Sequence, residues 1–428
     1  MDSDKNYESL KMSEEVLNES FFTDFMEEEK SDIDVRKTGF ENSFNERQVG
    51  SITIPVEPVS SRASLDVALD LFEQQPGLTA LPIEENDRVI GILERTSVEN
   101  RNESGLKRFV SKTCGEYVKE SPFTLNCSDF LEKVSAKVNE TAIREEVKHF
   151  VVLINNRSYY GIVSVAKINE KIEDLRNQDL EKAAIIQQNI LVKNSDSKKF
   201  PFNVCIWNKM ANQVGGDFYV SKELAEDKYI IGCFDVSGKN VSAALLTVTL
   251  GSLFSMFKLF DASKMTSIKL ITILDTFLQE IVPVGNFITG AVCYVDRKSG
   301  YVELYNCGHT NCFVYLKDES GKGKVATLKP TLPPFGMGAI ADAITSSGKG
   351  GYKMPLTTDF QIDLYSDGLT DMQNDDGERF GDDRTKEFFQ TLFNTDPYDV
   401  AKVTEKTVSD WIQKSLLPDD VTMINIRF

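Results

Sequence analysis

The chain has 428 residues, of which 41% are hydrophobic and 27% charged, and its formal net charge is −18. This length predicts two or three domains, and the composition is typical of a globular protein. The negative charge argues against a nucleic-acid partner, because phosphate backbones are bound by positively charged surfaces.

The sequence gives no sign of a membrane span or of disulfides. No uninterrupted apolar run reaches the roughly 20 residues that a bilayer requires, and Met1–Lys5 lacks a basic stretch followed by an apolar core. The 7 cysteines include no CxxC pair, and several lie within apolar runs, which indicates reduced, buried thiols. We therefore expect a cytoplasmic protein without a membrane partner.

Residues 1–50 are expected to form a disordered acidic tail, because they hold 14 acidic and 6 basic residues and few branched aliphatic ones. From residue 51 to 167 the pattern changes to two similar units, each with a helix, an apolar strand, a turn and a second strand. Such a duplication predicts a paired module with a ligand cleft at its pseudo-twofold axis. The expected helices are Ala63–Phe72 and Ser128–Val138, and the expected strands are Thr79–Ile83, Val89–Leu93, His149–Ile154 and Tyr160–Ser164.

The runs TALPIEENDRVIGIL and HFVVLINNRSYYGIVS resemble the tandem CBS (cystathionine-β-synthase) domains that precede bacterial signalling domains. In nucleotide-binding members of that family, a Thr follows the Gly-Ile-Val run, and an Asp three residues later holds ribose. The matching positions here are Glu94 and Ser97 in the first unit and Ser164 and Lys167 in the second. The ribose-binding carboxylate is missing from both units, so a structural or dimerising role stands beside ligand sensing. His149, beside an apolar run, is expected to pack or to form hydrogen bonds rather than to bind a ligand.

Residues 168–195 are expected to form a helical linker. One apolar stripe contains Ile168, Ile172 and Leu175, and a second contains Leu180, Ala184, Gln187 and Leu191. The step of five positions between the stripes breaks their phase. Such a helix fits a dimerising linker that couples the CBS-like module to the C-terminal region, or an ordinary amphipathic helix that lies on its own domain. A homodimer through this helix or through the CBS-like module is expected.

Residues 196–428 mix strands and helices without a regular βαβ alternation, which predicts a layered α+β sandwich. The expected strands are Phe202–Trp207, Phe218–Ser221, Tyr229–Asp235, Phe287–Asp296, Tyr301–Asn306, Cys312–Lys317, Gln361–Tyr365 and Val421–Phe428. The expected helices are Val241–Phe257, Thr266–Ile281, Arg384–Leu392 and Asp399–Ser415.

Four short acidic segments contain the residues that best indicate the chemistry of this region. They are Val214–Tyr219 (VGGDFY), Phe234–Gly238 (FDVSG), Tyr365–Leu369 (YSDGL) and Pro418–Thr422 (PDDVT). Each places an Asp beside an apolar, strand-like run, so the carboxylates are expected to meet in one cleft. Converging carboxylates repel one another and lose hydration unless a cation neutralises them. Oxygen ligands of this kind suit Mg²⁺ or Mn²⁺, and the set predicts a two-metal phosphoester hydrolase.

Six longer runs occur in a fixed order: VGGDFY, FDVSGKNVSAALL, FITGAVCYVDRKSGYVELYNCGHTNCFVY, LPPFGM, LYSDGLTDMQNDDGERFG and DDVTMINIRF. This ordered set resembles the SpoIIE/RsbU-type branch of the metal-dependent (PPM, type 2C-like) serine/threonine protein phosphatases. The resemblance implies an α-β-β-α sandwich with the metals at one end of its two sheets. It places Asp217, Asp235, Asp367 and Asp419 at the metal-ligand positions, with the Val236 carbonyl as a further ligand.

The activity implied by this resemblance is hydrolysis of phosphoserine or phosphothreonine in bacterial-type signalling. Two ions, Mn²⁺ or Mg²⁺, activate a water for direct attack on phosphorus in this mechanism. The expected partner is a phosphoprotein substrate, such as an anti-sigma-factor antagonist, and the N-terminal module is the expected regulator. The alternative is a pseudophosphatase that senses a ligand and sequesters a partner without hydrolysis.

Several other residues near these motifs have two interpretations. Lys239 is a candidate phosphate contact or a solvated lysine. His309 is expected to form a structural hydrogen bond rather than to act as a general acid. We expect Asp419 to bind metal and Asp420 to orient its neighbours, although the sequence allows the reverse. A third, weaker metal or an exposed acidic turn is expected at Asp371, Asp375, Asp376 and Glu378.

Overall fold

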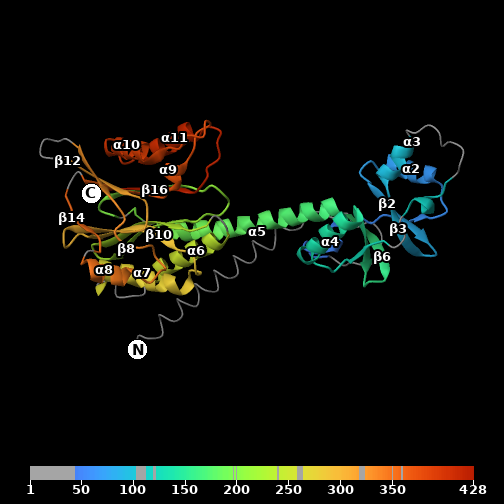
Figure 1. Ribbon diagram of the computed structural model, residues 1–428, viewed down its shortest axis with the longest axis horizontal. Coiled ribbons are helices and arrows are strands. Elements are labelled where there is room, and N and C mark those ends of the chain that lie inside the picture. The colour runs from blue at the N-terminus through green and yellow to red at the C-terminus, as the bar shows by residue number, and fades with distance from the viewer. Residues whose placement is uncertain are drawn as a thin grey trace, which may run out of the picture. The chain divides into compact units, whose positions relative to one another are not determined.

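The structure of the protein is a computed structural model (Figure 1). It describes residues 44–102, 112–118, 122–195, 197–198, 200–238, 241–257, 264–317, 323–348, 350–357 and 360–428. The chain divides into two compact units, Met1–Glu170 and Lys171–Phe428. Within the described ranges, no helix combines the length and the apolar character that a membrane span requires.

The expected acidic tail lies mostly outside the described residues, which begin at Phe44. The packed part of the first unit nevertheless begins before residue 51, because Val49 opens the 3-10 helix η1 (Val49–Ile52) and is fully buried. The Val49 N–H donates to the Asp129 carbonyl at 2.9 Å, and the Gly50 N–H donates to the Cys127 carbonyl at 3.0 Å. Val49 and Gly50 are therefore part of the folded unit rather than of the tail.

The first unit contains two copies of a β-α-β-β arrangement. The first copy comprises β1 (Val59–Ser60), α2 (Leu65–Gln74), β2 (Ala80–Glu85), β3 (Arg88–Glu94) and α3 (Arg95–Asn102). The second comprises η2 (Cys114–Tyr117), β4 (Thr124–Asn126), α4 (Leu131–Glu145), β5 (His149–Ile154) and β6 (Ser158–Ser164). In both copies the short first strand runs parallel to the second strand, which forms an antiparallel hairpin with the third. The fold thus repeats as the duplicated sequence pattern predicts.

His149 joins the two copies. Its ring is buried, with Nδ1 lying 2.8 Å from Glu94 Oε1 and Nε2 lying 2.8 Å from Thr79 Oγ1. These contacts are the hydrogen-bonding role predicted for this residue. The contact with His149 also engages the carboxylate of Glu94, which stands at one of the positions that match the nucleotide-binding residues of family members. In the second copy, the Lys167 N–H donates to Ser164 Oγ at 3.0 Å.

Helix α5 (Val165–Lys193) runs without a break through the predicted phase slip. The buried residues of α5 are Ile168, Ile172, Leu175, Gln187 and Leu191, whereas Leu180 and Ala184 are only half-buried. The C-terminal end of α5 is held by Asn194, the residue that follows it. The Asn194 carbonyl accepts the Ser221 N–H at 2.7 Å, and Asn194 Nδ2 donates to the Gly251 carbonyl at 3.1 Å.

The second unit contains two five-stranded sheets in which every neighbouring pair is antiparallel. The strands are β7 (Asn203–Lys209), β8 (Asp217–Ala225), β9 (Lys228–Val236), β10 (Ile288–Asp296), β11 (Tyr301–Cys307), β12 (Cys312–Lys317), β13 (Gly323–Leu328), β14 (Tyr352–Pro355), β15 (Phe360–Tyr365) and β16 (Val421–Arg427). The first sheet has the order β14-β11-β10-β9-β8, and the second has the order β13-β12-β15-β16-β7.

Helices cover both outer faces of this sandwich (Figure 1). They are α6 (Val241–Met256), α7 (Ser267–Ile281), α8 (Ile340–Ser347), α9 (Gly368–Asp371), α10 (Gly381–Phe393) and α11 (Val400–Ile412). Helices α6 and α7 lie against the first sheet, and α10 and α11 lie against the second. The α-β-β-α layering confirms the predicted α+β sandwich.

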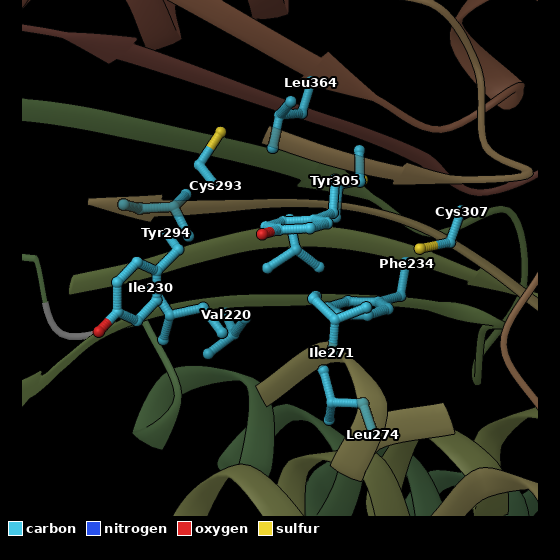
Figure 2. Close-up of a cluster of buried hydrophobic side chains, with 14 of the residues drawn as sticks. Val220, Ile230, Phe234, Ile271, Leu274, Cys293, Tyr294, Tyr305, Cys307 and Leu364 are labelled. Atoms are coloured by element: carbon cyan, nitrogen blue, oxygen red, sulfur yellow. The ribbon is translucent and has the colours of Figure 1, made fainter. Parts of the chain in front are cut away.

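Side chains that alternate along the strands of the first sheet fill two different layers of the core (Figure 2). Cys293 points toward the second sheet, where Leu364 lies, whereas Phe234 lies on the side of Ile271 and Leu274 of α7. A strand residue on this sheet therefore faces either the helices or the opposite sheet according to its place in the alternation.

Candidate functional site

Two aspartates lie side by side at one end of the first sheet. Asp217 at the start of β8 pairs with Asp235 near the end of β9, and Asp235 also pairs with Thr289 of β10. Directly opposed residues of antiparallel strands share a face, so the three side chains form one row. Their neighbours Phe218 and Phe234 both pack against Phe254 of helix α6. The row therefore faces the second sheet.

The second sheet contributes two hydroxyl groups that bind Asp217. Ser366 Oγ donates to Asp217 Oδ2 at 2.7 Å, and Thr422 Oγ1 donates to the same oxygen at 2.5 Å. Ser366 directly follows β15, and Thr422 lies in the neighbouring strand β16. The Asp217 carboxylate thus connects the two sheets at the end of the sandwich where the row lies.

Asp420 holds the segment that leads into Asp217. Its Oδ2 accepts the Gly216 N–H at 2.7 Å, and its Oδ1 accepts the Ala211 N–H at 2.8 Å. A Cβ on Gly215 would overlap the Asp420 carboxylate, so the close approach requires glycine. Asp419 is half-buried, and its Oδ1 accepts the Asp420 N–H at 2.9 Å. This geometry fits the expected division in which Asp420 orients its neighbours and Asp419 is the candidate ligand.

Val236 and Asp367 are the remaining predicted ligands. The Val236 N–H donates to the Gly216 carbonyl at 3.2 Å, and the Val236 carbonyl oxygen lies 2.9 Å from the position of a Cβ built on Gly216. Asp367 is exposed at the start of α9, and its own carbonyl accepts the Asp371 N–H at 2.9 Å. Val236 is the last residue of β9, and Asp367 directly precedes Gly368 at the start of α9.

The electrostatics of Asp217 reflect a crowded acidic site. Burial raises the pKa of the Asp217 carboxyl well above its usual value, and the negative charge of Asp235 raises it further. The hydrogen bonds donated by Thr422 and Ser366 oppose this shift, while the charge of Asp420 adds a smaller increase. Asp217 therefore carries its charge at a cost that a nearby cation would remove.

The charge of Asp367 affects the pKa of the same buried thiol as the charges of Asp217 and Asp235. Burial is the main reason that the pKa of the Cys233 thiol lies well above its usual value, and the charges of Asp217, Asp235 and Asp367 add to this effect. All three carboxylates therefore influence one buried thiol on β9.

The donor atoms are of the type that a hard divalent cation binds. Carboxylate and backbone carbonyl oxygens suit Mg²⁺ or Mn²⁺. The like-charged pair of Asp217, which is buried, and Asp235, which is half-buried, calls for positive charge nearby. Across the part of the chain that the structure describes, no three His, Cys, Asp or Glu side chains are arranged to hold a metal ion by themselves. The assignment of Asp217, Asp235, Val236, Asp367 and Asp419 as ligands stays a prediction.

His309 extends the row of side chains on the first sheet. Its Nδ1 lies 2.8 Å from Thr289 Oγ1, and its backbone N–H donates to Asn306 Oδ1 at 3.0 Å. Burial lowers the pKa of His309 to about 4, although the nearby Tyr365 carbonyl opposes this shift. Among the described residues, Nε2 has no hydrogen-bond partner. His309 is therefore neutral near pH 7 and forms a structural hydrogen bond, which is the interpretation favoured from the sequence.

The acidic residues that follow Asp367 form structural contacts. Asp371 pairs with Arg379, Glu378 pairs with Arg384, and the Asp375 carboxylate accepts a hydrogen bond from Ser415 Oγ. These contacts favour the exposed acidic turn over a third metal site. Lys239 lies outside the described residues, so its phosphate contact stays a prediction.

Sequence reasoning did not single out Ser366, Thr422, Thr289 or Gln187. Ser366 and Thr422 lie within the YSDGL and PDDVT motifs, close to their aspartates, so the sequence could have indicated them as site residues. Thr289 could be identified only from the pairing of β9 with β10. Gln187 was counted as one member of an apolar stripe. Nothing in that pattern predicts that its Nε2 donates to the Gly215 carbonyl and to Thr247 Oγ1, both at 2.7 Å.

Two sequence families match this chain. Residues 225–428 match Stage II sporulation protein E (SpoIIE), and residues 49–100 match the CBS domain. The phosphoserine phosphatase RsbP of Bacillus subtilis is 25% identical over 198 residues, which cover 45% of this chain and 45% of RsbP. Protein IcfG of Synechocystis sp. is 26% identical over 299 residues, which cover 60% of this chain and 43% of IcfG. The chain thus spans less than half the length of either curated relative.

The fold of the second unit also has a solved counterpart. The SiaA-PP2C domain of Pseudomonas aeruginosa matches with a TM-score of 0.50 at 21% identity, covering 60% of this chain and 98% of that domain. This likeness concerns the fold, and it agrees with the two-sheet sandwich described above. The SpoIIE match begins at residue 225, so Asp217 lies just before it, whereas Asp235, Asp367 and Asp419 lie inside. The chain therefore carries a domain of the SpoIIE family at residues 225–428 and a CBS domain at residues 49–100.

Proposed function

We propose that residues 196–428 form a metal-dependent phosphatase that hydrolyses phosphoserine or phosphothreonine in a phosphoprotein. The observation that carries this proposal is the paired Asp217 and Asp235 on adjacent strands, which face the second sheet. Two like charges held together in this way need a cation to remain ionised. The similarity to a phosphoserine phosphatase and the SpoIIE match support this reaction class.

In this proposal Asp217, Asp235, the Val236 carbonyl, Asp367 and Asp419 hold Mn²⁺ or Mg²⁺. When bound, two such ions neutralise phosphoryl charge and lower the pKa of a water that attacks phosphorus. The acidic turn after Asp367 is a weaker candidate for a third ion, because the carboxylates of Asp371, Asp375 and Glu378 already have partners.

The chain's own residues prepare the Asp217 carboxylate for this task. The hydroxyls of Ser366 and Thr422 donate to it, which favours its ionised form and fixes its orientation. Asp420 binds the Gly216 N–H and so fixes the backbone that enters Asp217. These contacts hold the carboxylate in place before any ligand arrives.

The proposal is tested by hydrolysis of para-nitrophenyl phosphate by the full chain with and without Mn²⁺. Wild type should turn over only with Mn²⁺, and Asp367→Asn should lose about 100-fold in activity if it holds the metal. Asp383→Asn, an exposed carboxylate on α10, is the matched control and should keep its activity. Metal-independent or absent turnover, with circular dichroism showing an intact fold, contradicts the proposal. Phosphopeptide binding without turnover would identify the pseudophosphatase alternative.

The substrate class is tested with phosphopeptides once turnover is established. Peptides that contain phosphoserine or phosphothreonine should release phosphate with Mn²⁺, whereas a phosphotyrosine peptide of the same sequence should not. A regulatory phosphoprotein such as an anti-sigma-factor antagonist is the proposed physiological substrate. Preference for phosphotyrosine would overturn this part of the proposal.

A second copy of this chain is the proposed partner of helix α5. Ile185, Ile186 and Val192 of α5 are 58%, 56% and 59% exposed, and Leu245 on the neighbouring helix α6 is 61% exposed. Exposed apolar side chains on two adjacent helices favour a protein–protein contact. Sedimentation velocity should detect a dimer that Ile186→Glu weakens, whereas Ile143→Glu on α4 should have no effect. A monomeric wild type would contradict the dimer.

A further inference from the structure

The turn between β11 and β12 is a point at which the chain crosses from one sheet of the sandwich to the other. Strand β11 belongs to the first sheet and β12 to the second. Two adjacent side chains of this turn reach opposite sheets. His309 Nδ1 lies 2.8 Å from Thr289 Oγ1 of β10 in the first sheet. Thr310 Oγ1 donates at 2.5 Å to the carbonyl of Tyr365, the last residue of β15 in the second sheet.

The conformation of this turn is fixed by its own contacts. Asn306 is fully buried, and its Oδ1 accepts the His309 N–H at 3.0 Å. Its Nδ2 donates to the Thr310 carbonyl at 2.7 Å. Gly308 has a φ of +64°, and a Cβ there would overlap the ring of Pro334, so this position requires glycine. The side chains at positions 309 and 310 are therefore presented by a well-defined turn.

The carbonyl of Tyr365 belongs to the peptide group that directly precedes Ser366. The Ser366 N–H donates to the Thr422 carbonyl of β16 at 3.0 Å. The Tyr365 carbonyl points the opposite way, towards β12, whose pairing with β15 ends two residues earlier at Asp363. The Thr310 hydroxyl therefore supplies a donor at the place where the ladder between β12 and β15 has ended, and the peptide group is held at both of its polar atoms.

Two groups of the candidate site directly follow this peptide group. Ser366 Oγ donates to Asp217 Oδ2 at 2.7 Å and so connects the second sheet to the first. Asp367 is the next residue and a candidate metal ligand. Without the Thr310 contact, the Tyr365 carbonyl loses a partner in a largely buried place, and the segment gains alternative conformations. Both groups could then shift relative to Asp217.

We propose that Thr310 is a positioning residue for Asp367, and that its hydroxyl fixes this aspartate relative to the row of side chains on the first sheet. This inference rests on the proposed function, because Asp367 is assigned there to metal binding. His309 makes the matching contact on the first sheet, since Thr289, which it contacts, pairs with Asp235. Carboxylates that come from two sheets and bind the same metal site must be held at a fixed separation. The crossover turn sets that separation.

The test compares Thr310→Val with Thr310→Ser in the full chain. Valine keeps the shape of threonine but removes the hydroxyl, whereas serine keeps the hydroxyl that donates to Tyr365. In hydrogen–deuterium exchange, residues 366–369 should exchange about tenfold faster in Thr310→Val and close to the wild-type rate in Thr310→Ser. Unchanged exchange in Thr310→Val, or equal acceleration in Thr310→Ser, would overturn the proposal.

Thr331→Val is the matched control for the loss of a threonine hydroxyl. Thr331 is exposed, and its Oγ1 donates to the Gly350 carbonyl at 3.3 Å, away from the peptide group before Ser366. Residues 366–369 should therefore exchange at the wild-type rate in this variant. Acceleration equal to that in Thr310→Val would show a general effect of losing a hydroxyl and would contradict the specific role of Thr310.

A Mn²⁺ titration that follows the melting temperature supplies a second readout. The Mn²⁺ concentration at half of the maximal shift should rise about tenfold in Thr310→Val and stay within about twofold of wild type in Thr310→Ser. A residue that only stabilised the fold would lower the melting temperature without Mn²⁺ and leave this midpoint unchanged. An unchanged midpoint in Thr310→Val therefore contradicts the positioning role. If Thr310→Val fails to fold, Thr310→Ala takes its place with the same expected outcomes, because it also removes the hydroxyl.

The two proposals fail in different ways. If wild type shows neither Mn²⁺ binding nor turnover, the proposed function is overturned whatever the variants do. The exchange comparison needs no metal. In that case, faster exchange of residues 366–369 in Thr310→Val would still show that Thr310 fixes this segment, and unchanged exchange would still overturn the positioning role.

Discussion

Asp420 accepts the backbone N–H of Gly216 at 2.7 Å, across a separation of 204 positions in the sequence. This contact gives two adjacent aspartates different surroundings. Asp420 is 5% exposed and binds backbone N–H groups, whereas Asp419 is half-buried at the entrance to β16. The pair DD in the PDDVT motif therefore divides into one residue that organises the backbone and one candidate ligand.

Asp420→Ala should destabilise the protein much more than Asp419→Ala. Removing the Asp420 carboxylate leaves the half-buried Ala211 N–H and the buried Gly216 N–H without their partner, which should lower the free energy of unfolding by about 2–5 kcal/mol. Asp419→Ala should change it by less than about 1 kcal/mol and instead reduce the rise in melting temperature caused by Mn²⁺. Urea denaturation with and without Mn²⁺ measures both effects. Equal destabilisation by the two substitutions would contradict the division of roles.

Gly368→Ala should be costly although alanine is the smallest change available. A Cβ at Gly368 would overlap the backbone carbonyl oxygen of Asp420, which cannot rotate away as a side chain can. We expect a loss of about 1–3 kcal/mol in the free energy of unfolding. Gly77→Ala is the control, because no atom of the described chain lies within 4 Å of a Cβ built there. Thermal unfolding that ranks the two variants equally would rule out this clash.

His309 should make the protein less stable as the pH falls. Burial lowers the pKa of His309 from 6.5 to about 4, so between these values the unfolded chain takes up a proton that the folded chain does not. His309 therefore opposes folding increasingly as the pH decreases through this window. His309→Gln should show a smaller loss of unfolding free energy between pH 7 and pH 5 than wild type. Thr289→Val keeps the titrating group and should keep the wild-type pH slope, and an unchanged slope in His309→Gln would refute the assignment.

The elements that carry the candidate site could be predicted because their strands are continuous apolar runs. Strands β8, β9, β15 and β16 are buried along most of their length, which leaves a clear signal in the sequence. The sequence analysis missed β13 and β14, because both are edge strands with largely exposed residues and no apolar run. It also missed the short helices α8 and α9, which have too few turns to show a period.

Only the site residues that lie in the acidic motifs could be predicted from the sequence. Asp217, Asp235 and Asp367 each lie beside an apolar run. The structure pairs Asp217 with Asp235 on adjacent strands, and Gly368, next to Asp367, lies against the backbone of Asp420. The partners that hold Asp217 arise from tertiary contacts over long sequence separations, such as 149 positions for Ser366 and 205 for Thr422. No local pattern encodes such a contact. This explains why the aspartates were found while the hydroxyls that orient them were not.

His149 should couple the two copies of the β-α-β-β arrangement in the first unit. Its ring contacts Glu94 Oε1 and Thr79 Oγ1, both at 2.8 Å, and the ring is buried. Thr79→Val and His149→Phe should each cost about 1 kcal/mol or more, and the double variant should cost less than their sum, because both remove the same hydrogen bond. The exposed pair Lys167 and Glu170 supplies the control, since Lys167→Ala should cost under about 0.5 kcal/mol.

This coupling is best measured by hydrogen–deuterium exchange of β2, β3 and β5 in the full chain. Both tryptophans, Trp207 and Trp411, lie in the second unit, so their fluorescence does not report on the first. If His149 joins the copies, His149→Phe should speed exchange in β2 and β3 as well as in β5, because the loss of one contact releases both hairpins. Faster exchange confined to β5 would mean that His149 stabilises only its own copy.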